Sequence, residues 1–425
     1  MGIDEILTNK QQQVLDSYLH DDWKFLILTG AFRAGKTIMN NYLFIMELKR
    51  IARLSIQRKD PHPQYILAGY SSNSIYTNVI SAIESYFGIT MKTDRHGHYH
   101  LLGIDIVPSY TGSIRGVGSI RGMTSYGAYI NEASLATHDV FQEILQRCSV
   151  EGARIICDTN PDIPTHWLKT DYIDNHDPKA RIKSFTFTID DNTFLSKDYV
   201  EAIKAATPRG MFYDRGILGQ WVTGDGIVYQ DFNKDTMVVD EVPDDLEYYC
   251  GVDWGFAKGH ENVITVMGDD LDTDISYLIG VYKSTGKYID YWVDIAQQIQ
   301  DKRGYGINFW CDSARPEYVS YFQQQDIQAR NADKSVMDGI EYCSSRIKLG
   351  KFKVLRSCAD PFLDDLYQYV WDPVKGVPKK EHDNVMDSFR YGLYNQHKQL
   401  DNEFIPNIYI PVSPFRRRLV SEMTI

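Results

Sequence analysis

Short apolar runs that end in glycine or in polar residues alternate with amphipathic segments along the first 160 residues. Buried strands of a parallel sheet have this pattern, and we expect them at 24–30, 64–70, 126–134 and 153–161. Residues 36–50 carry apolar side chains at helical spacing, and 98–110 alternates around Gly103 as a β-hairpin does. This order predicts an open α/β sheet with functional side chains at the carboxyl ends of its strands.

A second series of apolar runs begins near residue 247. It predicts three strands, a helix, a strand and a helix, at 248–255, 261–268, 276–284, 288–302, 307–313 and 315–325. This order differs from that of the first series and indicates a second domain with a mixed sheet. Residues 184–232 are rich in turn-forming residues and are expected to form a lid and a linker. The predicted boundaries are therefore 1–183, 184–232, 233–400 and 401–425.

Composition excludes several classes of protein. The net charge of −12 argues against a protein that coats DNA through a diffuse positive surface, although local patches can still hold DNA. No apolar run approaches the roughly 20 residues of a membrane helix. The six cysteines form no CxxC pair, which favours buried, reduced thiols.

The segment ILTGAFRAGKTIM, residues 27–39, has the spacing of a phosphate-binding loop. Gly30 is followed after four residues by Gly35, Lys36 and Thr37, between a predicted strand and a predicted helix. In such a loop Lys36 reaches the β- and γ-phosphates and Thr37 holds Mg²⁺. Arg33 lies inside the loop, where a generic nucleotide-binding loop does not require an arginine.

Polar residues at two later strand ends complete a candidate nucleotide site. Asn131 and Glu132 belong to the polar end of the strand at 126–134; Glu132 is the expected catalytic carboxylate, and Asn131 occupies the Mg²⁺ position as an amide. Thr159 and Asn160 belong to the polar end of the next strand, where they either sense the γ-phosphate or form a simple Asn-Pro turn. Arg121, ahead of the acidic strand, is either an arginine finger or an ordinary surface arginine.

Three aspartates suggest a second site. Asp253 and Asp312 end two strands of the second series, and Asp387 lies in a segment with a single apolar helical face. Oxygen ligands of this kind suit Mg²⁺ or Mn²⁺. Two such ions activate water and stabilise the leaving oxygen of a phosphodiester, which is the chemistry of a nuclease.

Together these motifs resemble the large terminase subunit of tailed bacteriophages, over about residues 5–397. The segments that carry the resemblance are LTNKQ (7–11), GAFRAGKT (30–37), IRGMTSYGAYINEAS (120–134), DTNPDIPTHWLKTDYI (158–173), FYDRGILGQWVTGDGIVYQDF (212–232), VDWG (252–255), CDSARPEYV (311–319) and DNVMDSFRYGLY (383–394). All of them occur in order and at compatible spacing.

The resemblance implies a P-loop ATPase core of the ASCE type at 1–183, a lid and linker at 184–232, an RNase H-like nuclease at 233–400 and a tail at 401–425. It implies ATP-driven translocation of double-stranded DNA into a procapsid and metal-dependent endonucleolytic cleavage of concatemeric DNA. The cofactors would be ATP with Mg²⁺ at the first site and two Mg²⁺ or Mn²⁺ ions at the second. Gln11 would contact the adenine, Arg121 would act on a neighbouring subunit, and Thr159 and Asn160 would couple hydrolysis to movement.

The implied partners are double-stranded viral DNA, the portal protein, the small terminase subunit and further copies of the chain in a ring. The implied location is the host cytoplasm, docked transiently on the procapsid and absent from the mature virion. Two groups of basic residues are open to DNA binding or to solvation alone: Arg416–Arg418 in the tail, and the helix-end set Lys49, Arg50, Arg53, Arg58 and Lys59.

The sequence departs from the family pattern in two places. Asn131 stands where the acidic strand usually carries aspartate, which leaves the handling of Mg²⁺ open. Asn384 stands where the nuclease helix often carries histidine, so the extra metal ligand is either His382 or Asp383. The alternatives are a helicase or other DNA translocase, which would need a second motor domain, and a DNA-binding scaffold with a degenerate ATP site.

Overall fold

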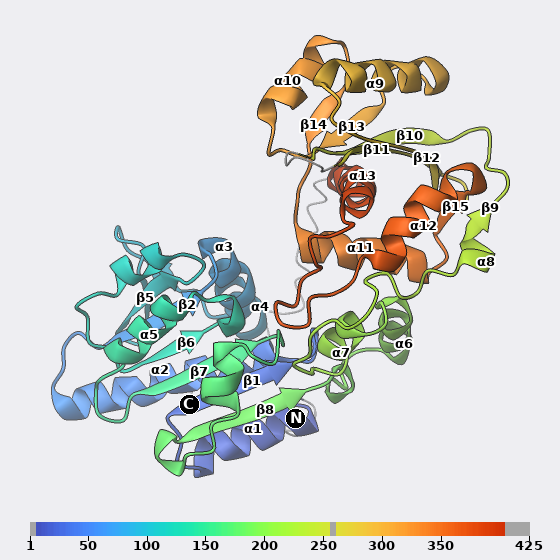
Figure 1. Cartoon of the computed structure of the whole chain (residues 1–425). Helices are drawn as coiled ribbons and strands as arrows, with labels where there is room; N and C mark the ends of the chain where they lie inside the picture. The colour runs from blue at the N-terminus through green and yellow to red at the C-terminus, as the bar shows by residue number, and fades with distance from the viewer. Residues whose placement is uncertain (1–5, 256–260, 404–425) are drawn as a thin grey trace. The chain divides into compact units, whose positions relative to one another are not determined.

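The computed structural model describes residues 6–255 and 261–403. The described chain forms two compact units (Figure 1). The first comprises residues 6–205 and 213–222, and the second comprises residues 206–212 and 223–403 except for 256–260. The predicted tail from residue 404 onward, with Arg416–Arg418, lies outside the described residues.

The first unit contains an eight-stranded sheet in the order β3-β4-β5-β2-β6-β7-β1-β8. Its strands are β1 Phe25–Gly30, β2 Gln64–Gly69, β3 Lys92–Thr93, β4 Tyr99–Leu101, β5 Ile104–Tyr110, β6 Gly127–Ile130, β7 Arg154–Thr159 and β8 Ile182–Phe187. Its helices are α1 Asn9–His20, α2 Lys36–Arg58, α3 Ser72–Ile75, α4 Ser81–Phe87, α5 His138–Arg147, α6 Lys197–Ala206 and α7 Met211–Gly216. The predicted strands and the predicted hairpin at 98–110 are confirmed.

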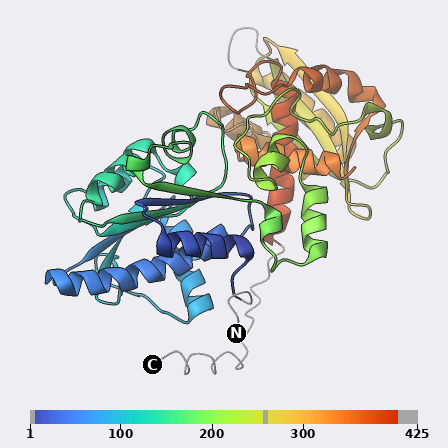
Figure 2. The same cartoon turned by 90° about the horizontal axis from the view of Figure 1, so that it is seen from below.

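Both faces of this sheet are covered, which explains its uninterrupted apolar strands. In β1, Leu26 and Leu28 pack into one apolar cluster, whereas Phe25 and Ile27 pack into another. Helices α1 and α2 lie side by side over the first cluster (Figure 2), and α5 contributes to the second. A strand buried on both faces has no position for an exposed polar side chain.

Strand β7 lies between β1 and β6 and pairs in parallel with each of them. An additional strand between the phosphate-loop strand and the acidic strand is the mark of the ASCE arrangement that the resemblance implies. Because β1, β6 and β7 are parallel, their carboxyl ends meet at one edge of the sheet. The α/β fold class of the first unit is therefore confirmed.

Strand β8 extends the sheet beyond the predicted end of the core. It pairs in parallel with β1 from Phe25↔Ile182 to Gly30↔Phe187. The boundary predicted between residues 183 and 184 consequently falls inside a strand. Helices α6 and α7 follow β8 within the segment expected to form the lid.

The second unit contains a mixed seven-stranded sheet in the order β14-β13-β10-β11-β12-β15-β9. Strands β10, β11 and β12 are antiparallel neighbours, whereas β13 runs parallel to β10. The strands are β9 Val238–Val239, β10 Glu247–Asp253, β11 Glu261–Asp270, β12 Ile275–Thr285, β13 Asn308–Cys311, β14 Ala329–Asn331 and β15 Phe352–Leu355. The predicted order of three strands, a helix, a strand and a helix is confirmed, and so is the mixed sheet, whose strand order is RNase H-like.

Helices cover both faces of the second sheet. Helices α9 and α10 lie on one face, and α11, α12 and α13 lie on the other (Figure 1). The helices of this unit are α8 Lys234–Met237, α9 Ile289–Arg303, α10 Pro316–Gln324, α11 Val336–Lys348, α12 Ala359–Gln368 and α13 Asn384–Glu403. Among the helices that the structure describes, none is long and apolar enough to cross a membrane.

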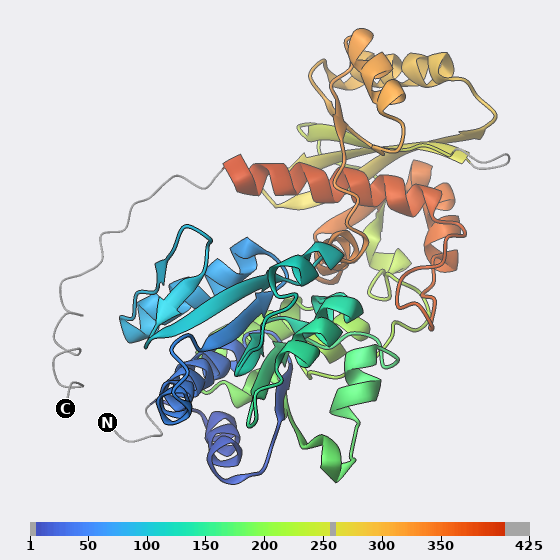
Figure 3. The ribbon, with the colours of Figure 1, turned by 90° about the vertical axis from the view of Figure 1, so that its left-hand side faces the viewer.

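Helix α13 packs directly on the central strand β10 (Figure 3). A Cβ atom at Gly251 would lie 1.8 Å from the carbonyl oxygen of Ser388, so only glycine permits this approach. The Ser388 hydroxyl donates to the carbonyl of Gly251 at 2.9 Å and bonds Thr265 on β11. The contact fixes where α13 begins relative to the end of β10.

We predict that Gly251→Ala destabilises the second unit by about 1–3 kcal/mol, because the added methyl group forces α13 away from β10. Thermal or urea unfolding followed by circular dichroism measures the change. Gly280→Ala, on β12, is the matched control, since its Cβ would make only ordinary contacts at 3.4 Å or more. Equal stability of the two variants would contradict the proposed close packing.

Candidate functional site

The phosphate loop joins the end of β1 to the start of α2. Gly30 has a φ of +135°, and a Cβ there would lie 2.0 Å from the carbonyl oxygen of Phe187. The loop therefore needs glycine at this position to pass beside β8. The amino terminus of α2, which begins at Lys36, directs backbone N–H groups into the loop, a geometry suited to phosphate.

The side chain of Lys36 lies inside the loop. Its Nζ donates to the carbonyl oxygens of Gly30 at 2.9 Å and Ala31 at 2.6 Å, and to Oδ1 of Asn160 at 3.0 Å. Burial lowers the pKa of Lys36 to about 8, while the nearby carboxylates of Asp158 and Glu132 act in the opposite direction. Thr37 follows in the first turn of α2 and is half-buried.

Three hydrogen bonds connect the phosphate loop to the last residue of β8 and to the segment that follows this strand. The N–H of Ala31 donates to the carbonyl of Phe187 at 2.8 Å, and that of Phe32 donates to Gly216 at 3.2 Å. The amide of Asn192 donates to the carbonyl of Arg33 at 2.6 Å. The Arg33 residue itself is exposed and adopts a left-handed backbone, with φ of +56°.

Gln11 reaches the same loop from α1. Its Nε2 donates to the carbonyl of Gly35 at 2.9 Å, and its Oε1 accepts from the N–H of Thr8 at 2.9 Å. Thr8 caps α1 with its side chain, so this capping box sets the position of Gln11. The structure thus places Gln11 beside the phosphate loop, and its contact with adenine stays a prediction.

Asn131 and Glu132 end β6 next to a carboxylate of β7 that the sequence motifs did not single out. Asp158 is 1% exposed and accepts hydrogen bonds from Asn131 Nδ2 at 2.8 Å, from the Glu132 N–H at 3.0 Å and from the Tyr129 hydroxyl at 2.8 Å. Asn131 Oδ1 also accepts from Asn78 at 3.0 Å. Asn131 is fully buried and holds Asp158 in place. Although Asn131 is an amide, the Asp158 carboxylate therefore supplies an acidic group at this edge of the sheet.

The Glu132 backbone is held in a left-handed conformation, with φ of +55°. A non-glycine residue in this region carries strain of about 1–3 kcal/mol, which is typical of functional sites. Burial, and then the neighbouring Asp158 carboxylate, raise the pKa of Glu132. A carboxylate of raised pKa that faces the phosphate loop is suited to polarising water.

Thr159 and Asn160 lie in the same cluster as the loop and the acidic strand. Thr159 Oγ1 accepts from the N–H of Ser134, two residues after Glu132, at 3.0 Å. Asn160 accepts from Lys36, as described above. Arg121 is exposed on a turn, and its guanidinium makes no hydrogen bond or ion pair within the described part of the chain. The structure therefore brings together every predicted residue of this site except Arg121 and the side chain of Arg33.

The second candidate site lies at the end of β10 and β13. Asp253 ends β10, and Asp312 follows β13 with its N–H donating to the carbonyl of Val252 at 2.9 Å. Asp387 lies in the first turn of α13, which the Gly251 contact brings against β10. Burial and then the carboxylates of Asp387 and Asp312 raise the pKa of Asp253 well above its usual range.

Two cations hold the carboxylates of this site. Lys334 Nζ donates to Asp312 Oδ1 at 2.6 Å, and Arg390 donates to Asp387 Oδ1 at 2.8 Å. Among the described residues, no group of three or more histidine, cysteine, aspartate or glutamate side chains is arranged to hold a metal ion. The carboxylate oxygens of Asp253, Asp312 and Asp387 are nevertheless the donor type that a hard divalent cation prefers.

The structure separates the two candidates for the extra ligand. Asp383 precedes α13, and its charge acts on Asp253. His382 is exposed, and its charge acts instead on Asp365. Of the two residues, it is therefore Asp383 whose charge acts on an aspartate of this site, and the identity of the extra ligand stays a prediction.

Asp158, Lys334 and Arg390 are the residues that sequence reasoning missed. Arg390 was within reach, because it lies three positions after Asp387 on a predicted helix and so shares its face. Asp158 stood inside the motif that supplied Thr159 and Asn160. Lys334 follows β14, far from any motif, and only the folded sheet brings it to Asp312.

A family model described as the amino-terminal part of the T4likevirus-type terminase large subunit matches residues 27–234. No curated protein matches the sequence. The solved large terminase of a thermophilic bacteriophage is 25% identical, with a TM-score of 0.79 over 92% of this chain and 98% of that chain.

Structures of the same phage protein in complex with ADP and with ATP-γ-S match with a TM-score of 0.74, at 25% identity, over 91% of this chain and 98% of that one. The similarity thus spans both units and nearly the full length of the phage protein. With the phosphate loop, the acidic edge and the mixed sheet in the order of the family's motifs, residues 27–234 carry a terminase large subunit domain, and both units match the fold of a solved phage large terminase.

Proposed function

We propose that the first unit hydrolyses ATP and that the hydrolysis drives double-stranded DNA into a procapsid. The observation that carries this proposal is the meeting of Lys36, Asn160 and Glu132 at one sheet edge. Lys36 binds the β- and γ-phosphates, Glu132 polarises the attacking water, and Asn160 senses the γ-phosphate. Gln11 lies where it can contact the adenine.

The Mg²⁺ of this site would supply charge neutralisation at the phosphates. Thr37 is the residue of the loop whose hydroxyl would hold it. Asn131 adds no charge of its own, but Asp158, which it holds at 2.8 Å, provides a carboxylate at the strand ends. This arrangement supports hydrolysis over a degenerate, non-catalytic ATP site.

Arg121 is exposed, with no partner among the described residues, and we propose that it completes the ATP site of a neighbouring copy in a ring. Arg33, also exposed, senses phosphate or orders that neighbour. Thr159 and Asn160 pass the change at the γ-phosphate to the segment after β8. The proposed partners are viral DNA, the portal protein and the small terminase subunit, in the host cytoplasm and on the procapsid but not in the mature virion.

We further propose that the second unit is an endonuclease that cuts concatemeric DNA. Asp253, Asp312, Asp387 and Asp383 would hold two Mg²⁺ or Mn²⁺ ions, which activate water and stabilise the leaving oxygen. The mixed sheet of this unit has the RNase H-like order and not that of the first unit, which favours a nuclease over the second motor domain of a helicase.

We expect Glu132→Gln to lower ATP turnover by roughly 10²–10⁴-fold, because the amide cannot polarise water. A steady-state phosphate-release assay measures turnover, and a fluorescent ATP analogue checks that binding is retained. Glu201→Gln, an exposed residue on α6, is the control. Turnover that is equally near zero in the wild type and in Glu132→Gln would refute the motor.

Arg121→Ala should also lower turnover, on the order of 10³-fold, if the arginine acts as a finger. Mixing Arg121→Ala with Glu132→Gln copies tests whether it acts on a neighbour. A Glu132→Gln copy still offers Arg121 to the intact Glu132 of the other variant, so phosphate release should recover in the mixture. No recovery would show that Arg121 does not act between copies.

For the nuclease, Asp253→Asn should abolish plasmid cleavage in Mn²⁺ or Mg²⁺, because one carboxylate of the metal-binding set is lost. ATP turnover by the same variant should be unchanged, which separates the two sites. Asp244→Asn, at an exposed position before β10, is the matched control. Cleavage that persists in Asp253→Asn would place the nuclease site elsewhere.

A further inference from the structure

A groove of about 480 Å³ lies between α1 and α2 in the first unit. Its lining comes from the end of α1, the carboxyl-terminal half of α2 and Arg154, the first residue of β7. Arg154 marks the amino-terminal edge of the parallel sheet, whereas the nucleotide-binding residues lie at the carboxyl-terminal edge. The groove is therefore separate from the ATP site.

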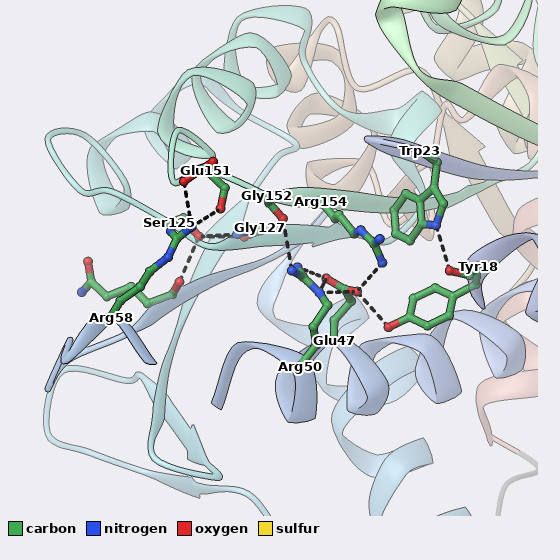
Figure 4. A network of polar contacts seen from close by, with 11 residues as sticks. Tyr18, Trp23, Glu47, Arg50, Arg58, Ser125, Gly127, Glu151, Gly152 and Arg154 are labelled. Atoms are coloured by element: carbon green, nitrogen blue, oxygen red, sulfur yellow. Dashed lines mark hydrogen bonds and ion pairs between the residues drawn. The ribbon is translucent and has the colours of Figure 1, made fainter. Parts of the chain in front are cut away.

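A buried carboxylate organises the base of this groove (Figure 4). Glu47 is fully buried and accepts hydrogen bonds from Arg50 at 2.6 Å and from the Tyr18 hydroxyl at 2.8 Å. Arg154 lies 3.8 Å from Glu47 and stacks over Trp23 with its guanidinium 4.6 Å from the ring centroid. These contacts hold Arg50 and Arg154 in position, and the Glu47 carboxylate compensates part of their positive charge.

Two further cations of the groove have no such partner. Lys49 and Arg53 are exposed, and neither makes an ion pair or a side-chain hydrogen bond with a residue that the structure describes. They are four positions apart on α2 and so lie on the same face of the helix. Four cations line the groove against the single carboxylate of Glu47, on a chain whose net charge is −12.

The groove also has an apolar wall. Leu19 is 56% exposed, and Met46 and Leu54 are half-buried beside it. A nucleic-acid backbone presents phosphate and sugar and leaves such a wall unused. Cations beside aliphatic side chains instead match a protein segment that carries carboxylates on both sides of an aliphatic residue.

The turn between β11 and β12 of this chain has that composition. Leu271 is 69% exposed and stands between Asp270 and Asp272. Asp270 shapes the turn by accepting from the N–H of Asp272 at 3.0 Å and from the Thr273 hydroxyl at 2.7 Å. The Asp272 carboxylate is exposed and has no partner within the described residues.

Other strongly exposed aliphatic side chains in the described chain lack these flanking charges. Ile56, 77% exposed, stands between a serine and a glutamine, and Val374, 71% exposed, stands between a proline and a lysine. The acidic turn at 270–272 is thus the complement of the groove in both charge and apolar character.

We propose that the groove of one copy binds the β11–β12 turn of a second copy, with Leu271 against the apolar wall and its flanking aspartates beside Lys49 and Arg53. The proposal rests on the self-association proposed above and names one contact that holds neighbouring copies together. Because its ion pairs are exposed, the contact weakens as salt is added.

Cysteine cross-linking tests the contact directly. All six native cysteines are buried, so an introduced surface thiol is the reactive one. Arg53→Cys protein is mixed with Asp272→Cys protein at high concentration and oxidised with copper phenanthroline. We expect a disulfide-linked pair at a yield at least tenfold above that of a Lys59→Cys and Asp272→Cys mixture. A yield equal to that control overturns the proposal.

Charge reversal provides the second measurement. Arg53→Glu and Asp272→Lys should each lower the mass measured by light scattering, and mixing the two variants should restore it. Plasmid cleavage should stay at the wild-type level, since neither residue belongs to the nuclease site. ATP turnover should fall and recover together with the mass, because the proposed Arg121 finger acts on a neighbouring copy.

The outcomes separate this contact from self-association in general. Wild-type mass retained in both variants refutes the groove contact and leaves self-association standing. A wild-type chain that stays monomeric at every concentration refutes both. If Arg53→Glu instead loses binding to a double-stranded oligonucleotide while its self-association is unchanged, the groove is a DNA site and the proposal fails.

Discussion

The arrangement of the strand ends in the first unit depends on Asp158, because a buried carboxylate requires hydrogen-bond donors. Its donors come from Tyr129, Asn131 and the backbone of Glu132, so the end of β6 is tied to the end of β7. Glu132, with its left-handed backbone, stands at this connection. Burial raises the pKa of Asp158, and the charge of Lys36 offsets part of that cost.

In the second unit, several carboxylates lie close together, whereas at the strand ends of the first unit a single buried carboxylate is surrounded by hydrogen-bond donors. Its carboxylates repel one another at the ends of β10 and β13, and the close approach of α13 at Gly251 adds Asp387 to them. Lys334 and Arg390 offset that repulsion, and Arg390 is itself almost fully buried and donates to the carbonyl of Ser335. The fold thus brings the carboxylates of this site together despite their mutual repulsion. A bound divalent cation would reduce that repulsion.

Much of this organisation could be predicted from the sequence because it is local. The strand, loop and helix around Lys36 are contiguous, and the parallel strands carry their polar residues to one edge by their direction alone. Strand β8 was harder to recognise, since IKSFTF alternates and has only one fully buried residue, in a segment dominated by turns. The partnerships of Asp158 with Asn131 and of Lys334 with Asp312 depend on which strands become neighbours, and no local pattern encodes that.

Three hydrogen bonds between the phosphate loop and the segment from Phe187 to Gly216 have a mechanical consequence: Ala31 and Phe32 donate to that segment, and the Arg33 carbonyl accepts from it. These bonds couple the phosphate loop to that segment. If either one shifts, the other must shift with it or the hydrogen bonds must break. A displacement of the loop would then reach α6 and α7 through the backbone itself. The loop and that segment are thus joined directly by hydrogen bonds, without an intervening chain of side-chain contacts.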